Sequence, residues 1–474
     1  MTPAASITKP VEPLRPPRIL PPVRMRRFPL MLPRFLRNPL ACIPREAYEE
    51  PIVVAAGPPR RVFVCDPELV KIVLLEKQDL FPKTAIQRRV LGPLLGNGIL
   101  LSQGDEWRWQ RHTVAPLFRH SEILDYVPAM AAAAQTQIAK WRASDLGLPR
   151  VIEHDMSQAT YEVISQTMLA GGGEAVGAAL GEDRGAYLEG LPWSLVYAAL
   201  GIPEWLPRPL KSRMRRREAR LRAAVRDLVQ HRRAEASAPE DLLARLLAAR
   251  RSDSGAVMSD EEMVDTLLTF LLAGHDTTAK ALTWALYLLS RSPTWEDRVM
   301  NEIASAVPAG PVAAASIEAL PTVLQVVKET LRLYPPAPET TRIATIDMEL
   351  GGVRVEAGTI IDIPIYAIHR HRRLWHDPDT FDPDRFSPEE EAARPRYQFI
   401  PFGAGPRICI GASFALVEAT VMLAMFLREF RFRCPAGFEP TPISRLTLAA
   451  REGMPMILSD RHGQARAVYD THEG

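Results

Sequence analysis

Residues 401–411 read P-F-G-A-G-P-R-I-C-I-G, and the apolar run A-S-F-A-L-V-E-A-T-V-M-L-A-M-F-L follows directly at 412–427. Three glycines allow this loop to turn tightly, because glycine has no Cβ atom and adopts positive φ angles easily. A tight loop exposes backbone N–H groups, and the helix predicted for 412–427 adds the positive end of its dipole. Both features stabilise negative charge on sulfur. The stretch therefore marks Cys409 as a candidate functional residue, and an inert buried cysteine is the alternative.

The composition is that of a globular protein, because 47% of the 474 residues are hydrophobic and 24% are charged. No linker divides the chain, so we expect one large domain at 48–474, preceded by a Pro/Arg-rich segment at 1–47. The prolines of that segment favour an extended strap on the surface. A net charge of +2 gives no indication of nucleic-acid binding.

The four cysteines lie far apart and form no C-x-x-C pair, which argues against a disulfide framework or a zinc site. The first forty residues contain neither a signal-peptide core nor an apolar run that could span a bilayer. We therefore expect a cytoplasmic monomer without a transmembrane anchor. The basic segment 208–222 is compatible with peripheral contact to a membrane, and a solvated helix face is the alternative.

Hydrophobic periodicity predicts a mainly helical chain with a small β-rich part. The runs 51–56 and 61–64 predict one hairpin, and 352–366, broken at Ala357-Gly358, predicts another. The clearest helix begins at Ser259, where S-D-E-E matches a capping box, and continues to about Ser290. Apolar residues surround it on most faces, so we expect it to be buried in the centre of the fold.

A polar break, A-G-H-D-T-T, interrupts this helix at 273–278. Glycine costs about 1 kcal/mol relative to alanine in a helix interior, and an unpartnered buried polar group costs about 1–3 kcal/mol more. Asp276 beside Thr277 is suited to organising a short water chain that delivers protons into a cavity. The alternative is a kink in which a threonine hydroxyl bonds the carbonyl one turn back.

Two helical pairs combine arginine with a partner on one face. Glu329 and Arg332 are three residues apart, and Arg385 in F-D-P-D-R-F is a candidate further partner, although an exposed ion pair is the alternative. Trp107 and Arg111 are four residues apart in W-R-W-Q-R and present an N–H donor and a guanidinium to a carboxylate. For Trp107, ordinary core packing is the alternative.

Taken together, these residues resemble the cytochrome P-450 superfamily of haem-thiolate monooxygenases, in its soluble bacterial-type form. The cysteine loop fits F-x-x-G-x-R-x-C-x-G at every fixed position, and the central break fits (A/G)-G-x-(D/E)-T-T. Glu329 and Arg332 fit the family's E-x-x-R helix, and Trp107 and Arg111 fit its W-x-x-x-R helix. The resemblance extends from about residue 48 to residue 458.

The resemblance implies the cytochrome P-450 fold, with a long central helix over haem b and a small β-rich region. It implies that Cys409 binds the iron and that Asp276 and Thr277 guide protons. The residues it implies for haem binding are Trp107, Arg111, Arg342, Phe402, Arg407, Cys409 and Gly411. Those it implies for the scaffold are Glu329, Arg332 and Arg385, and those for the substrate pocket are Phe270, Ala273 and Ala337.

The activity implied is insertion of one atom of O2 into an apolar substrate such as a fatty acid or terpenoid, by hydroxylation or epoxidation. Only 65 residues follow Cys409, so electrons from NAD(P)H would arrive through a reductase and a separate ferredoxin or flavodoxin-type carrier. Arg108, Arg394 and Arg396 could face such an acidic carrier. A peroxide-driven peroxygenase and a haem-based sensor without turnover are the alternatives.

Overall fold

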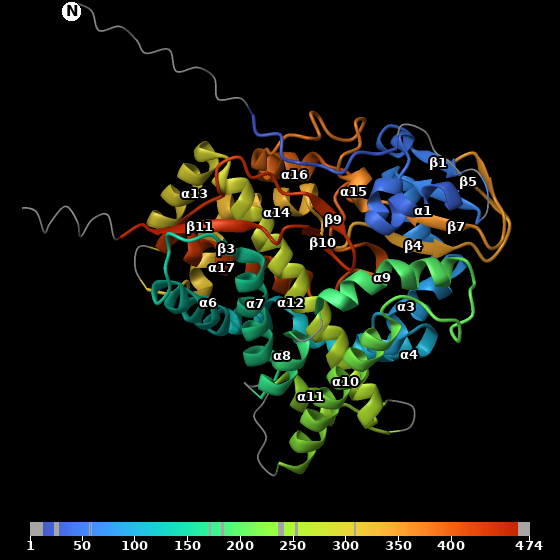
Figure 1. Ribbon diagram of the computed structural model, residues 1–474, viewed down its shortest axis with the longest axis horizontal. Coiled ribbons are helices and arrows are strands. Elements are labelled where there is room, and N and C mark those ends of the chain that lie inside the picture. Colours follow the sequence, from blue (N-terminus) through green and yellow to red (C-terminus); the bar gives the residue numbers. More distant parts are fainter. Residues whose placement is uncertain are drawn as a thin grey trace, which may run out of the picture.

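Helix α12 (Asp260–Ser290) crosses the middle of the molecule and is buried over most of its length (Figure 1). The structure, a computed structural model, describes residues 13–462 except 23–27, 56, 58, 170–171, 182–183, 236–240, 252–254 and 308–309. Ser259 Oγ accepts from the N–H of Glu262 at 3.3 Å, and the N–H of Ser259 donates to Glu262 Oε2 at 2.8 Å. The predicted capping box and central helix are therefore confirmed.

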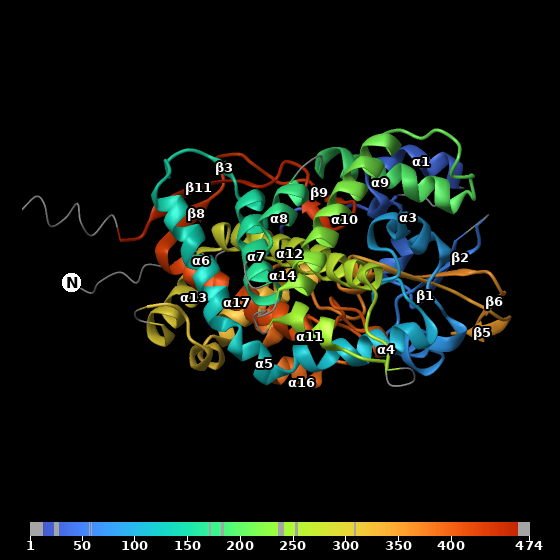
Figure 2. The same cartoon turned by 90° about the horizontal axis from the view of Figure 1, so that it is seen from below.

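The other helices pack around α12, and α7 lies beside it in both views (Figures 1 and 2). They are α1 (Phe28–Arg37), α2 (Pro67–Lys71), α3 (Ala85–Leu95), α4 (Gly104–Val114), α5 (His120–Asp125), α6 (Val127–Arg142), α7 (Ile152–Met168), α8 (Glu174–Gly181), α9 (Arg184–Ala199), α10 (Lys211–Ala234), α11 (Leu242–Ala248), α13 (Pro293–Ala306), α14 (Pro321–Leu333), α15 (Ile365–Ile368), α16 (Pro388–Ala393) and α17 (Ala412–Glu429).

Two apolar clusters form the core, and α12 contributes to both. Its N-terminal part, up to Leu271, packs in a cluster with α3, α8 and α10. Its C-terminal part, from Ala279, packs in a cluster with α6, α14 and α17. The polar break at 273–278 therefore lies at the junction of the two clusters, where α12 needs no continuous apolar surface.

The strands form small sheets. The largest has the order β1 (Ile52–Ala55), β2 (Arg61–Val64), β7 (Ile360–Ile363) and β4 (Thr340–Ile343). The remaining strands pair as β5 (Met348–Leu350) with β6 (Val353–Val355), β9 (Pro442–Ser444) with β10 (Leu448–Ala450), and β11 (Pro455–Asp460) with β3 (Arg150–Val151) and β8 (Phe430–Arg433). The antiparallel pairing of β1 with β2 confirms the first predicted hairpin.

The second predicted hairpin, at 352–366, is wrong. Strand β6 pairs with β5 before it, through a turn at Gly351 and Gly352, whose φ angles are +58° and +78°. Strand β7 instead lies between β2, to which it is parallel, and β4. Its residues Ile361, Asp362 and Ile363 are buried on both faces, as is typical of a central strand, and Asp362 pairs with Arg61 of β2.

The N-terminal segment is only partly an extended strap. Residues 13–22 contain no helix or strand, but Phe28–Arg37 forms α1 despite Pro33, which its prolines did not predict. Ile19, Leu40 and Ile43 are buried in the main apolar cluster, so this part of the chain packs on the core. None of the described helices is both long and apolar enough to cross a bilayer.

Candidate active site

The cysteine loop contains a 3-10 turn (Gly405–Arg407) and leads into α17, the helix predicted to follow it. The N–H of Cys409 donates to the carbonyl of Phe402 at 2.9 Å, which closes the loop. Gly403 and Gly405 have φ angles of +72° and +70°. A Cβ atom on Gly405 would lie 2.0 Å from the carbonyl oxygen of Leu74, so the loop needs glycine here. The Cys409 side chain itself is accessible to solvent.

Opposing effects act on the pKa of the Cys409 thiol. Dense surrounding protein raises the pKa of the Cys409 thiol, and the Gly411 N–H and the charge of Arg111 only partly oppose this effect. A bound metal ion deprotonates a coordinating thiol, so iron bound here would further favour the thiolate.

A cation cluster of Lys83, Arg342 and Arg407 lies near the loop. Arg407 stacks over the ring of Trp107, with its Cζ 4.3 Å from the ring centroid, and donates to the carbonyl of Ser102 at 3.0 Å. Arg342 donates to Thr340 Oγ1 and to the carbonyl of Thr341, each at 2.8 Å. In the described part of the chain, no carboxylate forms an ion pair with any of these three cations.

Burial and mutual repulsion disfavour the charges of this cluster. Burial, with the charge of Arg407, lowers the pKa of Arg342 to about 10. Burial, with the charges of both arginines, lowers the pKa of Lys83 to about 7. Burial also lowers the pKa of Arg407. An anion placed among these groups would remove the penalty.

Arg111 connects α4 to the cysteine loop. It donates to the carbonyl of Ile408 at 2.8 Å, next to Cys409, and burial lowers its pKa. The structure thus brings both members of the W-x-x-x-R pair to the loop: Arg111 directly and Trp107 through Arg407. Chemically, these groups fit haem b, which presents an iron for the sulfur and two propionates for the cations.

The break in α12 presents an accessible face. Ala273 is exposed and Thr277 half-buried, although most of the helix is buried, so this face of α12 is accessible. The hydroxyl of Thr277 donates to the carbonyl of Ala273 at 2.6 Å. This is the backbone bond of the kink alternative, and it keeps Thr277 on the same face as Ala273.

The Asp276 side chain contacts Thr447 and Lys280 and does not share the hydrogen bond of Thr277. Its Oδ2 accepts from Thr447 Oγ1 at 2.7 Å, in the turn between β9 and β10, and its Oδ1 lies 3.2 Å from Lys280 Nζ. Lys280 also donates to Glu153 Oε1 of α7 at 2.7 Å. The acid and the alcohol are therefore neighbours in sequence that contact different parts of the protein.

Aromatic packing joins α12 to the cysteine loop. The ring centroids of Phe118 and Phe270 are 5.9 Å apart, and those of Phe118 and Phe414 are 6.4 Å apart. Phe118 also reaches within 3.8 Å of the position of a Cβ atom on Gly411. Of the expected pocket residues, Phe270 is therefore buried close to the loop, whereas Ala273 and Ala337 are exposed.

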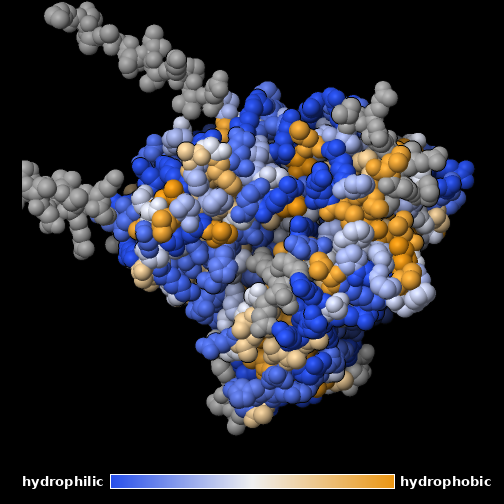
Figure 3. All heavy atoms as spheres, in the orientation of Figure 1, coloured by the Kyte–Doolittle hydropathy of each residue, from blue (hydrophilic) through white to orange (hydrophobic). Residues whose placement is uncertain are grey.

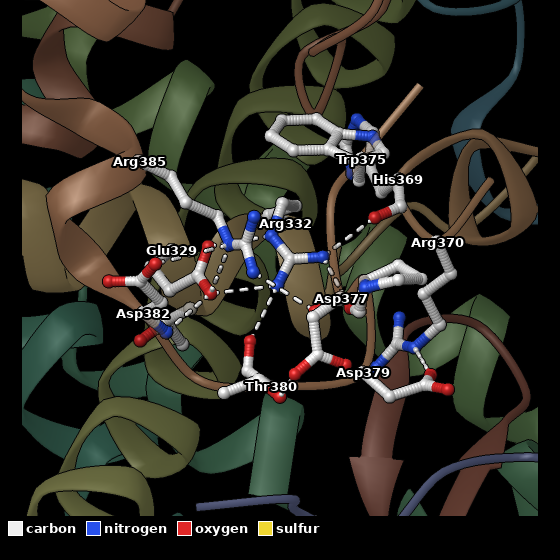
Figure 4. Close-up of polar contacts among 12 residues, drawn as sticks. Glu329, Arg332, His369, Arg370, Trp375, Asp377, Asp379, Thr380, Asp382 and Arg385 are labelled. Carbon is white, nitrogen blue, oxygen red and sulfur yellow. Dashed lines mark hydrogen bonds and ion pairs between the residues drawn. The ribbon is translucent and has the colours of Figure 1, made fainter. Parts of the chain in front are cut away.

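The Glu329 cluster consists of Glu329, Arg332, Arg385 and the carbonyls around them (Figure 4). The side chains of Glu329 and Arg332 are fully buried. Arg332 uses all five N–H donors: two bond the Glu329 carboxylate at 2.6 and 2.7 Å, and three bond the carbonyls of His369, Pro378 and Thr380. Arg385 lies 3.7 Å from Glu329 and donates to the carbonyl of Asp377. The exposed-pair alternative is excluded here.

Sequence reasoning missed Lys83, Phe118, Glu153, Lys280 and Thr447. Lys280 had a signal, because it is four residues after Asp276 and so shares its helix face. The other four are brought to the site by long-range packing, which no local pattern reveals.

Comparison with known proteins matches residues 44–456 to the family model described as Cytochrome P450. The chain is 33% identical over 401 residues to cyclooctat-9-en-7-ol 5-monooxygenase from Streptomyces melanosporofaciens, covering 84% of this chain and 85% of that protein. It is 29% identical to a cytokinin hydroxylase from Arabidopsis thaliana, covering 87% and 81%. The structure matches the haem domain of cytochrome P450DA with a TM-score of 0.76 at 24% identity, covering 87% of this chain and 90% of that one.

Proposed function

The chain belongs to the cytochrome P450 family and is a monooxygenase of that family, and we propose that it inserts one atom of O2 into an apolar small molecule, by hydroxylation or epoxidation. The observation that carries this proposal is the accessible Cys409 beside cations that have no carboxylate partner among the described residues. Haem bound there would supply an iron centre whose thiolate ligand favours cleavage of the O–O bond.

In this proposal each group of the loop holds one part of haem. Cys409 binds the iron, and Phe402, half-buried against the core, limits water on the sulfur side. Trp107, Arg111, Arg342 and Arg407 bind the propionates. The lowered pKa of Arg342 supports this assignment, because a carboxylate beside it would offset the cost of burying its charge.

On the opposite side, Asp276 and Thr277 guide protons to the substrate pocket. The Thr277 hydroxyl lies on the accessible face of α12, where it can donate to a bound molecule after exchanging its bond to the Ala273 carbonyl. Phe270, Ala273 and Ala337 form part of the pocket wall, which is apolar and suits a hydrocarbon substrate.

For the substrate we propose a terpenoid, with a fatty acid as the second class. The support is that two relatives are named for oxidising cyclooctat-9-en-7-ol and 11-oxo-beta-amyrin. Electrons from NAD(P)H would arrive through a reductase and a ferredoxin or flavodoxin-type protein. Arg108 and Arg396 are exposed and could contact such an acidic carrier, although Arg108 also pairs with Asp105. Arg394 instead packs over Phe386 and Trp375.

We also propose peripheral contact with a membrane. Large apolar side chains are exposed on α1, on the segment before it and on the α9–α10 connection: Leu20, Leu30, Leu200 and Trp205, which is 79% exposed. Figure 3 shows apolar surface gathered over this part of the molecule. Trp205→Ala should weaken co-sedimentation with anionic vesicles. If the wild-type protein does not co-sediment with such vesicles, the membrane contact is excluded.

The thiolate is tested by the absorption of the reduced protein with carbon monoxide. We expect a far-red-shifted Soret band, lost in Cys409→Ala and kept in the control Cys434→Ala, which removes a half-buried free thiol elsewhere. A shifted band that survives in Cys409→Ala would show that another residue is the ligand.

Thr277→Ala separates the alternatives. A monooxygenase should lose most of its coupling between NAD(P)H oxidation and product, whereas a sensor should bind its ligand unchanged and a peroxygenase should keep its peroxide-driven rate. Thr283→Ala is a matched control, because Thr283 makes the same bond to the carbonyl four residues back on α12 but lies in the core.

A further inference from the structure

Lys280 is a charged side chain in the middle of a buried apolar helix. Only 2% of it is exposed, and Ala279, Ala281 and Leu282 around it belong to the apolar core. Taking an ammonium group out of water costs several kcal/mol, and an apolar residue of similar size would pack here at no such cost. The fold therefore gives no reason for a lysine at this position, and its partners must provide one.

The partners of Lys280 are two carboxylates on two helices. Its Nζ lies 2.7 Å from Glu153 Oε1 and 3.2 Å from Asp276 Oδ1. The two carboxylate oxygens thus lie within about 6 Å of each other, a span that one bridging water covers. Thr447 Oγ1 donates to the other oxygen of Asp276 and fixes its orientation toward α7.

Glu153 links this group to the outside of the protein. It lies in the first turn of α7, where the helix dipole stabilises an ionised carboxylate, and its side chain is 18% exposed. Its second oxygen, Oε2, is buried and has no hydrogen-bond partner in the structure as far as the residues are described. A buried acceptor without a partner is a position for an ordered water.

Helix α7 is fitted closely to the break in α12. A Cβ atom on Gly274 would lie 2.4 Å from Ile164 Cδ1, so glycine allows the two helices to approach. Thr160 of α7 donates to the carbonyl of His275 at 2.9 Å. Packing at the break therefore holds α7 beside α12, the two helices that carry Glu153 and Lys280.

We propose that Lys280 is a positioning residue that holds the Asp276 carboxylate toward α7, so that Asp276 receives its protons from solvent beside Glu153. The only transfer is one proton: a water beside Glu153 passes a proton to Asp276 and takes one back from bulk solvent. This inference rests on the proposed function, in which Asp276 and Thr277 together guide protons. It adds Lys280, Glu153 and α7 to the proton path.

The positioning is tested first without turnover, by urea unfolding of Asp276→Asn, Lys280→Met and the double variant. We expect the effects on the unfolding equilibrium constant to depart from additivity by at least threefold, because each variant removes the same contact. Additive effects would overturn the proposal. This readout holds even if the proposed monooxygenase activity fails.

The second test measures the fraction of NAD(P)H electrons recovered in product. Lys280→Met and Glu153→Gln should each lower this fraction at least threefold, with more hydrogen peroxide released and a changed solvent isotope effect, while Lys280→Arg should restore at least half of it. The control is Lys328→Met, which breaks a similar bridge to Glu391 at 2.6 Å on α16. Wild-type coupling in a haem-containing Lys280→Met protein would overturn the proposal. If Lys280→Met fails to fold, Glu153→Gln decides, because it preserves shape.

Discussion

The Glu329 cluster and the cation cluster both contain buried arginine, but among the described residues only the Glu329 cluster pairs the arginine charge with a carboxylate. Around Glu329, every N–H donor of Arg332 has an acceptor, and the neighbouring His369 stays neutral because burial lowers its pKa. Around Arg407, three cations repel one another without a carboxylate among the described residues. The first arrangement completes the fold, whereas the second leaves positive charge that an incoming anion can satisfy.

The largest effect should come from breaking the satisfied cluster. Glu329→Gln keeps the shape but leaves Arg332 buried without a counter-charge, so we expect the free energy of unfolding to fall by about 3–5 kcal/mol. Urea denaturation measures this loss. Glu391→Gln is the control, because its bridge to Lys328 is only partly buried, and it should cost about 1 kcal/mol or less. Equal losses would contradict the distinction between buried and partly exposed pairs.

Removing a charge from the cation cluster should not lower the free energy of unfolding. Arg342→Met removes a repelled charge, so the free energy of unfolding of the haem-free protein should stay within about 1 kcal/mol of wild type or rise. The same variant should lose haem about tenfold faster, because a charge-assisted hydrogen bond to a propionate is worth about 1.5–3 kcal/mol. Stopped-flow transfer of haem to an acceptor globin measures this rate. Unchanged haem loss would remove Arg342 from the propionate site.

A smaller effect is expected from Lys83, in the pH dependence of the stability of the haem-free protein. Burial, with Arg407 and Arg342, lowers the pKa of Lys83 to about 7 in the folded chain, against 10.5 for an ordinary lysine. Between these values the unfolded chain binds more protons, so the stability of the haem-free protein should rise with pH across this window. Lys83→Met should flatten that rise. Haem should flatten it too, since a propionate favours the charged lysine, and a rise that persists in Lys83→Met would show that Lys83 is not its source.

Much of the fold could be predicted from local pattern. The capping box at Ser259 fixed the start of α12, and the glycines around Cys409 predicted its loop, because these signals depend on neighbours in sequence. The hairpin at 352–366 failed because strand partners are chosen by burial in the whole sheet. Residues 145–185 gave no signal, yet α7 within them supplies Glu153 to Lys280. The motifs located the site, but long-range packing decided which charges face one another.

Gly405 limits which substitutions the cysteine loop can accept. Any larger residue there would push against the backbone of Leu74, in the π-helical stretch Ile72–Glu76. A library that varies the loop to change the redox potential should therefore leave position 405 untouched and vary Ala404 or Ile410 instead. Because Gly405 has no Cβ atom, the cysteine loop packs directly on the backbone of Leu74. An insertion after Leu74 should therefore shift the loop and change haem binding, although Leu74 and Gly405 lie more than three hundred residues apart in the chain.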